Sequence, residues 1–397
     1  MTFDRRAFCV TLCVLVAGIT AGPTTSAQTS ATRIVAIGDV HGNFEGFTGI
    51  LQATGLIDAK QQWAGGNTVF IQTGDIYDRG DGEHKALDLL MRLEGEAKHA
   101  GGRVEPLLGN HEIVNILGDF RDVSPATFAS FADGRSEARR ARAYDDLVKA
   151  ATHHGREAAV PARDAWMTAH PLGFIELSES AAPHGKYGRW LRTHKAVVAV
   201  NHTAFMHAGI THTFQGSLDD VNRSVTDEIT AWDATKEAMV KAELIPPYAT
   251  MAETIAAAKA EVDRISNAKQ PLDAASRQFS ERLQRTAAIE QSPLLSQDGP
   301  MWFRGFALWK ETDEPPFTAL LGRLGINRFV AGHTPMPTRR IMNRWDYRVF
   351  QIDTGMLGGE FFKDGRASAL EIVGDRITAI YTDSREVVVP GAGQVPR

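Results

Sequence analysis

The chain has 397 residues, of which 43% are hydrophobic and 23% charged. This composition is typical of a soluble globular protein, and the length allows one large domain or two ordinary ones. A formal net charge of −5 gives no reason to expect nucleic acid or an anionic membrane surface as the main partner.

The N-terminus has the pattern of an export signal. Two arginines at positions 5 and 6 precede an apolar run over residues 8–21 and a small-residue stretch that ends at Ala27. The run is shorter than the roughly 20 residues that span a bilayer, so we expect cleavage after Ala27 rather than a permanent anchor. The paired arginines resemble a twin-arginine signal, and the general secretory route is the alternative. The prediction is a periplasmic or secreted protein.

Both cysteines of the chain, Cys9 and Cys13, lie in the segment that would be removed. A mature chain without cysteine forms no disulfide and offers no thiolate to a metal. Any metal site must therefore use oxygen and nitrogen donors.

The mature chain opens with alternating strands and helices. Apolar runs rich in β-branched residues or leucine predict strands at 33–39, 68–73 and 104–108, and apolar residues at helical spacing predict a helix in each interval. This order is typical of parallel strands with helices on the sheet faces.

Helical and strand segments follow in blocks. Two helix-rich insertions are expected at about 118–195 and 215–298, within a catalytic domain over 28–384 that a flexible tail, 385–397, follows. Further strands are expected at 196–200, 203–206, 328–331, 347–352, 370–373 and 377–381.

Polar side chains follow the first three strands at the point where each strand ends. Asp39 and His41 follow the first strand, Asp75 the second, and Asn110 and His111 the third. Ligand sites of open α/β sheets lie outside the carboxyl ends of the strands, so we expect these side chains to converge.

Such side chains suit a pair of divalent cations. Two cations about 4 Å apart bind the oxygens of a phosphate ester and bring a bound water near neutral pKa, and they need imidazoles and carboxylates, one of them shared. The candidate ligands are Asp39 and His41 for one ion, Asp75 for both, and Asn110, His207 and His333 for the other.

The neighbouring residues suit the remaining chemistry. His111 could protonate the leaving oxygen, with Asp78 orienting its imidazole and raising its pKa. The planar fork of Arg79 suits the substrate phosphate.

Five short motifs carry a family resemblance. They are GDVHGN at 38–43, GDIYDRG at 74–80, GNHE at 109–112, HAG at 207–209 and GHT at 332–334. In this order they resemble the signature of calcineurin-like metallophosphoesterases, in the phosphoprotein phosphatase branch. Pro335 stands where the wider superfamily has a second histidine, which favours that branch.

The resemblance implies a fold and a reaction. The implied fold is an α/β metallophosphoesterase sandwich of two mixed sheets flanked by helices, with the insertions forming a cap. The implied reaction is hydrolysis of phosphate monoesters by a metal-bridging hydroxide, with His111 as general acid paired with Asp78. The resemblance assigns the six ligands to the same two metals as above. It also assigns Arg79 and Asn110 to the substrate phosphate.

Within that branch the chain resembles the bacterial Shewanella-like protein phosphatases. The stretch 299–304 looks like their Trp-x-Arg element, which implies Arg304 as a second phosphate-binding arginine. Manganese is the metal that the resemblance implies, although iron, zinc and magnesium accept the same ligands. The expected substrate is a protein phosphorylated on Ser, Thr or Tyr.

Two other functions remain open on the sequence. The same motifs occur in symmetrical diadenosine tetraphosphatases, which makes a nucleotide hydrolase the main alternative. A non-catalytic phosphate-binding protein is the second alternative, but no ligand or acid of the set is missing.

Overall fold

The computed structural model describes residues 32–155, 160–268 and 271–391. The predicted export signal over 1–27 lies outside these residues. In the described ranges no helix combines the length and apolarity needed to cross a membrane.

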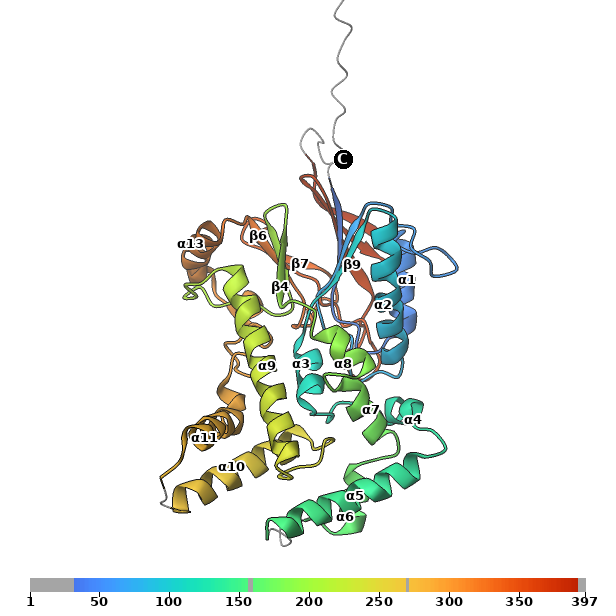
Figure 1. Ribbon diagram of the computed structural model, residues 1–397. Coiled ribbons are helices and arrows are strands. Elements are labelled where there is room, and N and C mark those ends of the chain that lie inside the picture. The colour runs from blue at the N-terminus through green and yellow to red at the C-terminus, as the bar shows by residue number, and fades with distance from the viewer. Residues whose placement is uncertain (1–31, 156–159, 269–270, 392–397) are drawn as a thin grey trace, which may run out of the picture. The chain divides into compact units, whose positions relative to one another are not determined.

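Two mixed β-sheets form the centre of the protein (Figure 1). The first has six strands in the order β11-β10-β9-β1-β2-β3, and the second has five in the order β4-β5-β6-β8-β7. The strands of the first sheet are β1 (Arg33–Ile37), β2 (Val69–Gln72), β3 (Arg103–Pro106), β9 (Ser368–Val373), β10 (Arg376–Tyr381) and β11 (Arg385–Val389). Those of the second are β4 (Val197–Val200), β5 (Thr203–Met206), β6 (Arg328–Ala331), β7 (Met342–Arg344) and β8 (Val349–Gln351).

The strands that carry the motifs run parallel within each sheet. β1 pairs with β2 and β2 with β3 in parallel, and β5-β6 and β6-β8 are also parallel pairs. Parallel strands are buried on both faces, which explains why β1 is apolar at every position after Arg33.

Successive residues of β1 face two different cores. Ile34 and Ala36 belong to the cluster that joins the two sheets, together with Phe205 and Phe350 of the second sheet. Val35 and Ile37 belong to a cluster that includes residues of the covering helices. This alternation follows from the two-residue period of a strand and packs the sheets face to face.

Helices cover the outer faces of the sheets. α1 (Phe44–Ala53) and α2 (Glu83–His99) lie beside the first sheet, and α13 (Glu314–Leu324) lies beside the second (Figure 1). The prediction of two mixed sheets flanked by helices is therefore confirmed.

The remaining helices fall mainly in the two predicted insertions. Between β3 and β4 lie α3 (Asn110–Leu117), α4 (Pro125–Phe131), α5 (Ser136–His153), α6 (Arg163–Ala169), α7 (Phe174–Ala181) and α8 (Lys186–Leu191). Between β5 and β6 lie α9 (Leu218–Lys241), α10 (Met251–Ala268), α11 (Ala274–Ala287), η2 (Ile289–Gln291), α12 (Gly305–Leu308) and η3 (Glu311–Asp313), followed by α13. Each insertion has a small apolar cluster of its own, around Trp166 and Leu283 respectively. Their role as a cap stays a prediction.

Two strands differ from the sequence-based expectation. Residues 385–389, expected as the start of a flexible tail, form β11, which pairs with β10 through an irregular register. β7 was not expected at all. Both are edge strands with partly exposed residues. β7 has no apolar run, and the valine run 387–389 of β11 is followed directly by Pro390 and Gly391, which is the pattern of a chain tail. Residues 392–397 of the expected tail lie outside the described part of the chain.

Candidate metal centre

The carboxyl ends of parallel strands from both sheets hold the predicted ligands. In the first sheet, Asp39 follows β1, Asp75 follows β2 and Asn110 begins α3 after β3. In the second sheet, His207 follows β5 directly, and His333 follows β6 by two residues. These two edges meet, so residues far apart in the sequence come into contact. Asp39 and His333 are 294 residues apart, and the backbone amide of His333 donates to Asp39 Oδ1 at 2.9 Å.

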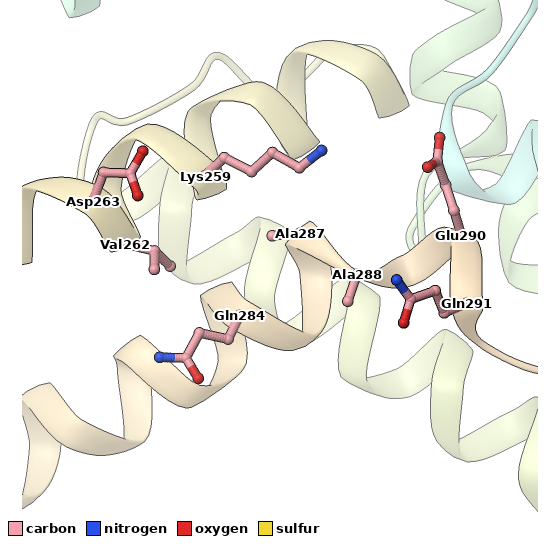
Figure 2. Close-up of a pocket in the computed structure, with 8 residues that line it drawn as sticks. All are labelled: Lys259, Val262, Asp263, Gln284, Ala287, Ala288, Glu290 and Gln291. Atoms are coloured by element: carbon pink, nitrogen blue, oxygen red, sulfur yellow. The ribbon is translucent and has the colours of Figure 1, made fainter. Parts of the chain in front are cut away.

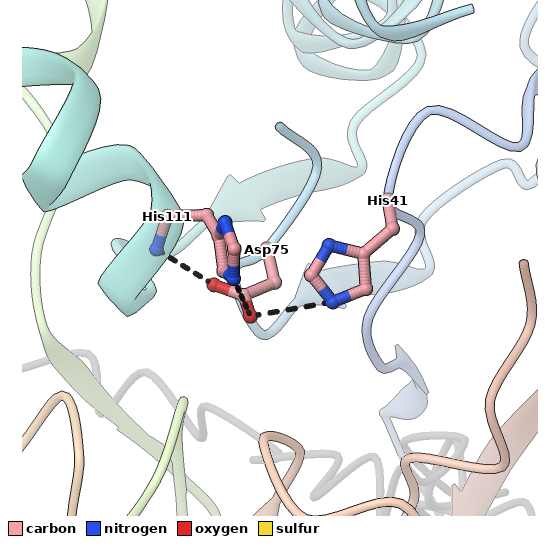
Figure 3. A group of neighbouring side chains, drawn as sticks. All are labelled: His41, Asp75 and His111. Carbon is pink, nitrogen blue, oxygen red and sulfur yellow. Dashed lines mark hydrogen bonds and ion pairs between the residues drawn. The ribbon is translucent and has the colours of Figure 1, made fainter. Parts of the chain in front are cut away.

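Asp75 lies at the centre of the cluster. Its Oδ2 is 3.6 Å from His41 Nε2 and 3.9 Å from His111 Nε2, and Figure 3 shows it between these two imidazoles. Its Oδ1 is 3.4 Å from His207 Nε2. The two carboxylate oxygens therefore face two different groups of donors, as a carboxylate shared by two cations must.

The other ligand candidates complete these two groups. His207 Nε2 lies 2.8 Å from Asn110 Oδ1 and 3.1 Å from His333 Nδ1, and Asp39 Oδ2 lies 4.0 Å from His41 Nε2. Within the described ranges, two sets of three side chains have metal-ligating geometry: His41 with Asp75 and His111, and Asp75 with His207 and His333. The structure thus brings all six predicted ligands together, and it also places His111 beside the first group.

Backbone carbonyls fix the orientation of three imidazoles. His41 Nδ1 donates to Tyr77 O and His207 Nδ1 to Thr73 O, both at 3.0 Å, and His333 Nε2 donates to Trp302 O at 3.1 Å. The other nitrogen of each ring then carries a lone pair that faces the carboxylates. Two such lone pairs, on His207 Nε2 and His333 Nδ1, face each other at 3.1 Å. A cation relieves this repulsion, so the donor set fits divalent metal.

The electrostatics of the cluster agree with this fit. Burial raises the pKa of Asp39 well above its usual range and that of Asp75 to about 7. Burial lowers the pKa of His41 and His207 well below the usual range, and that of His333 to about 3. The imidazoles are therefore neutral, as ligands must be, and the buried carboxylates lack the compensating charge that a cation supplies.

His111 belongs to a hydrogen-bonded chain behind the cluster. Its Nδ1 donates to Asp78 Oδ2 at 2.6 Å, and the Asn115 amide donates to both oxygens of Asp78 at 3.0 Å. Burial lowers the pKa of His111, but the carboxylates of Asp75 and Asp78 outweigh it and raise the pKa to about 9. This arrangement holds an imidazolium with Nε2 facing the cluster, which is the geometry of a general acid.

Two arginines lie on either side of the cluster. Arg79 Nη1 donates to His41 Nε2 at 2.8 Å, and Arg79 Nη2 lies 3.0 Å from His111 Nε2. Arg304 donates from Nη1 to His333 O at 3.1 Å and to Thr334 Oγ1 at 3.3 Å. Both guanidinium groups are close enough to bind a phosphate held at the cluster.

Glu112 has a role that the sequence reasoning missed. Its Oε2 accepts the amides of Asp75 and Gly109 at 2.7 and 2.8 Å, and its Oε1 accepts those of Ile76 and Tyr77 at 2.8 and 3.4 Å. A Cβ on Gly109 would lie 2.3 Å from Asp75 Oδ1, so only glycine permits this approach. The fully buried carboxylate of Glu112 thus joins the second and third motif loops.

Replacing Glu112 with alanine should lower the free energy of unfolding by about 3 kcal/mol or more, because four buried amides lose their acceptor. Urea unfolding followed by circular dichroism measures the change. Glu112→Gln keeps one carbonyl oxygen and should lose less. The control is Glu105→Ala, which removes a carboxylate from the nearby β3; an equal loss in the two alanine variants would contradict the bracing role of Glu112.

Asp353 and Phe362 also reach the cluster. The buried carboxylate of Asp353 contacts Asp39, and burial raises the pKa of Asp353 to about 6. The Phe362 ring stacks near the His41 ring with centroids 6.0 Å apart. No motif marks Phe362, and its place depends on how the loop after β8 folds back.

A cavity elsewhere in the chain has a different character. It has a volume of about 490 Å³ and lies between α10 and α11 of the second insertion (Figure 2). Its lining includes Lys259, Asp263 and Gln284 but none of the predicted site residues. The candidate centre is therefore at the strand ends and not in this cavity.

Comparison with known proteins agrees with the geometry. Residues 32–229 match the family model "Calcineurin-like phosphoesterase". The chain is 46% identical over 99 residues, a quarter of each chain, to Shewanella-like protein phosphatase 2 of Arabidopsis thaliana. It is 24% identical over 329 residues, 82% of this chain and 67% of the other, to Shewanella-like protein phosphatase 1 of Plasmodium berghei.

A solved structure shows the same fold. The cold-active protein-tyrosine phosphatase of a psychrophilic Shewanella species superposes with a TM-score of 0.58 at 21% sequence identity, over 90% of this chain and 80% of that one. Fold, metal-ligating groups and family model agree. Residues 32–229 therefore belong to the calcineurin-like phosphoesterase family, and the chain is a metallophosphoesterase.

Proposed function

We propose that this chain hydrolyses phosphate monoesters on proteins at a centre of two divalent cations. Asp39, His41 and Asp75 would hold one cation. Asp75 would also hold the other, together with Asn110, His207 and His333. The observation that carries the proposal is Asp75, whose Oδ2 faces the neutral imidazole of His41 and whose Oδ1 faces the neutral imidazole of His207. The Shewanella-like protein phosphatases among the relatives support a phosphoprotein as the substrate.

The residues around the cations bind and orient the substrate. Once bound, two divalent cations would supply Lewis acidity for the phosphate oxygens and lower the pKa of a water toward neutral. Arg79 and Arg304 bind the remaining phosphate oxygens from two sides, and the Asn110 amide lies within the same group. They orient the ester so that the bond to the leaving oxygen points toward His111.

His111 acts as the general acid. It gives the proton on Nε2 to the leaving oxygen as the ester bond breaks, and Asp78 stabilises the imidazolium before that transfer. His111 also lies 3.9 Å from Asp75, but its Nδ1 bond to Asp78 favours proton transfer over a ligand role.

The test is metal analysis of residues 28–397 followed by a substrate panel. We expect two equivalents of metal, loss of hydrolysis and a lower melting temperature after chelation, and recovery with one cation, for which manganese is our expectation. The substrates are phosphotyrosine and phosphoserine peptides and diadenosine tetraphosphate.

Two outcomes would contradict the proposal. Full hydrolysis by metal-free protein would exclude the metal centre. Hydrolysis of diadenosine tetraphosphate without any hydrolysis of phosphopeptides would instead indicate a nucleotide hydrolase. Export of the chain and removal of residues 1–27 remain separate predictions, which N-terminal sequencing of the protein from its native cell would test.

A further inference from the structure

Phe362 separates two arginines beside the candidate centre. The Cζ of Arg79 lies 5.6 Å from the ring centroid of Phe362, and the Cζ of Arg339 lies 5.9 Å from it. The same ring stacks with the His41 ring at an interplanar angle of 25°. Arg339 is thus a third guanidinium near the centre, in addition to Arg79 and Arg304, and it lies one phenyl ring away from Arg79.

The loops hold Arg339 in an unusual conformation. Its φ is +54°, in the left-handed region that is strained for residues other than glycine, and its Nε donates to Lys363 O at 3.0 Å. A Cβ on Gly355 would lie 3.1 Å from Arg339 Nη1 and 2.7 Å from Phe362 Cβ. Gly355 therefore leaves the room that the guanidinium and the ring occupy. Strain of this kind is often found at binding sites.

Arg339 and Lys363 line a cavity of about 480 Å³ whose wall carries four cations and one carboxylate, Asp364. Two other cations of this wall are neutralised, because Arg340 pairs with Glu386 and Arg366 with Asp383. Over the residues that the structure describes, no ion pair involves Arg339 or Lys363. On a chain of net charge −5, these two cations are available to an anion.

We propose that this cavity is a second anion subsite, in which Arg339 and Lys363 bind an acidic group of the substrate near its scissile phosphate. The proposal rests on the proposed protein phosphatase function and adds a preference for acidic phosphopeptides. Both guanidinium carbons lie within 6 Å of the Phe362 centroid. The separation of the two guanidinium groups therefore has an upper limit that an extended peptide, at about 3.3 Å per residue, spans in roughly three residues, so the acidic group belongs within that range of the phosphorylated residue. A carboxylate and a second phosphate share the required chemistry.

The experiment compares phosphopeptides that differ at one position. Each carries the same phosphorylated residue, and the position two residues away holds Glu, phosphothreonine, Ala or Lys; a second series varies the position three residues away. We expect kcat/KM to be roughly fivefold higher for the Glu peptide than for the Ala peptide in one series, and higher again for phosphothreonine. The preference should fall as salt is raised, because the cavity is open to solvent. If kcat/KM is higher for the phosphothreonine peptide but not for the Glu peptide, the subsite binds phosphate alone.

Charge changes at the cavity test the residues themselves. Arg339→Gln and Lys363→Gln should each reduce the ratio of kcat/KM between Glu and Ala peptides, and Arg339→Glu should invert the order so that the Lys peptide is preferred. The control Arg223→Gln removes an arginine from exposed α9 and should leave the ratio unchanged. Because the readout is a ratio within one variant, a general loss of activity does not imitate the result.

Two failures are distinguishable. Equal kcat/KM for all peptides, or a preference that survives Arg339→Gln and Lys363→Gln, overturns the subsite and leaves the protein phosphatase standing. Absence of hydrolysis for every peptide, with the metals restored, overturns the proposed function and the subsite together.

Discussion

Asp75→Asn should reduce the hydrolysis of phosphate monoesters by about a thousandfold or more, with little effect on the fold. Asparagine has the same shape, and its carbonyl oxygen can still accept the amide of His111, which donates to Asp75 Oδ1 at 3.0 Å. The variant lacks the negative charge that faces both donor groups, so neither cation retains its shared ligand. Steady-state kinetics and metal content measured on the same preparation check this result.

The matched control for this variant is Asp145→Asn. It makes the same change on exposed α5, where Asp145 forms a surface ion pair with Arg163, and it should leave kinetics and metal content unchanged. Wild-type activity in Asp75→Asn would show that Asp75 is not the shared ligand. If Asp75→Asn loses activity but keeps its metal content, the Asp75 charge is needed for catalysis and not for metal binding.

His111→Asn should slow the hydrolysis of phosphoserine peptides by about a hundredfold to a thousandfold, which is the usual contribution of a general acid. The loss should be much smaller for 4-nitrophenyl phosphate, because 4-nitrophenolate leaves without needing a proton at neutral pH. Comparing kcat for the two substrates therefore tests proton donation directly. Asp78→Asn should show the same substrate dependence, and the double variant should be little worse than His111→Asn alone.

The geometry supplies a sharp alternative for His111. It stands in one group with His41 and Asp75, so it could be a metal ligand instead of the acid. In that case His111→Asn would lower the metal content and slow both substrates equally. Normal metal content with a selective loss on the alkyl ester supports the acid.

The sequence was sufficient for the parts of the fold that depend on local pattern. The apolar runs of β1 and β2 predict buried parallel strands, and the motif after each one predicts where Asp39 and Asp75 meet. Topology alone then brings His207 and His333 to the same edge, because β5 and β6 are parallel. These predictions needed no knowledge of side-chain packing.

Other features depend on contacts that leave no local signal. In the sequence, Glu112 has only the pattern of a residue in the first turn of a helix. Its carboxylate nevertheless holds the loops of Asp75 and Gly109 together. Phe362 stands in a glycine-rich loop and reaches His41 only because the loop after β8 folds back over the first sheet's edge. The edge strand β7 forms because β8 offers an open side to pair with.

The contact between Asp39 and His333 has a consequence for biogenesis. During translation the first three motifs are made long before the last one. An incomplete chain therefore lacks the donor of His333 and would bind a cation weakly. Loading must wait until β6 has joined β5. Under the proposed function, the conditions in which β5 and β6 come together would then be the conditions in which the second metal is chosen.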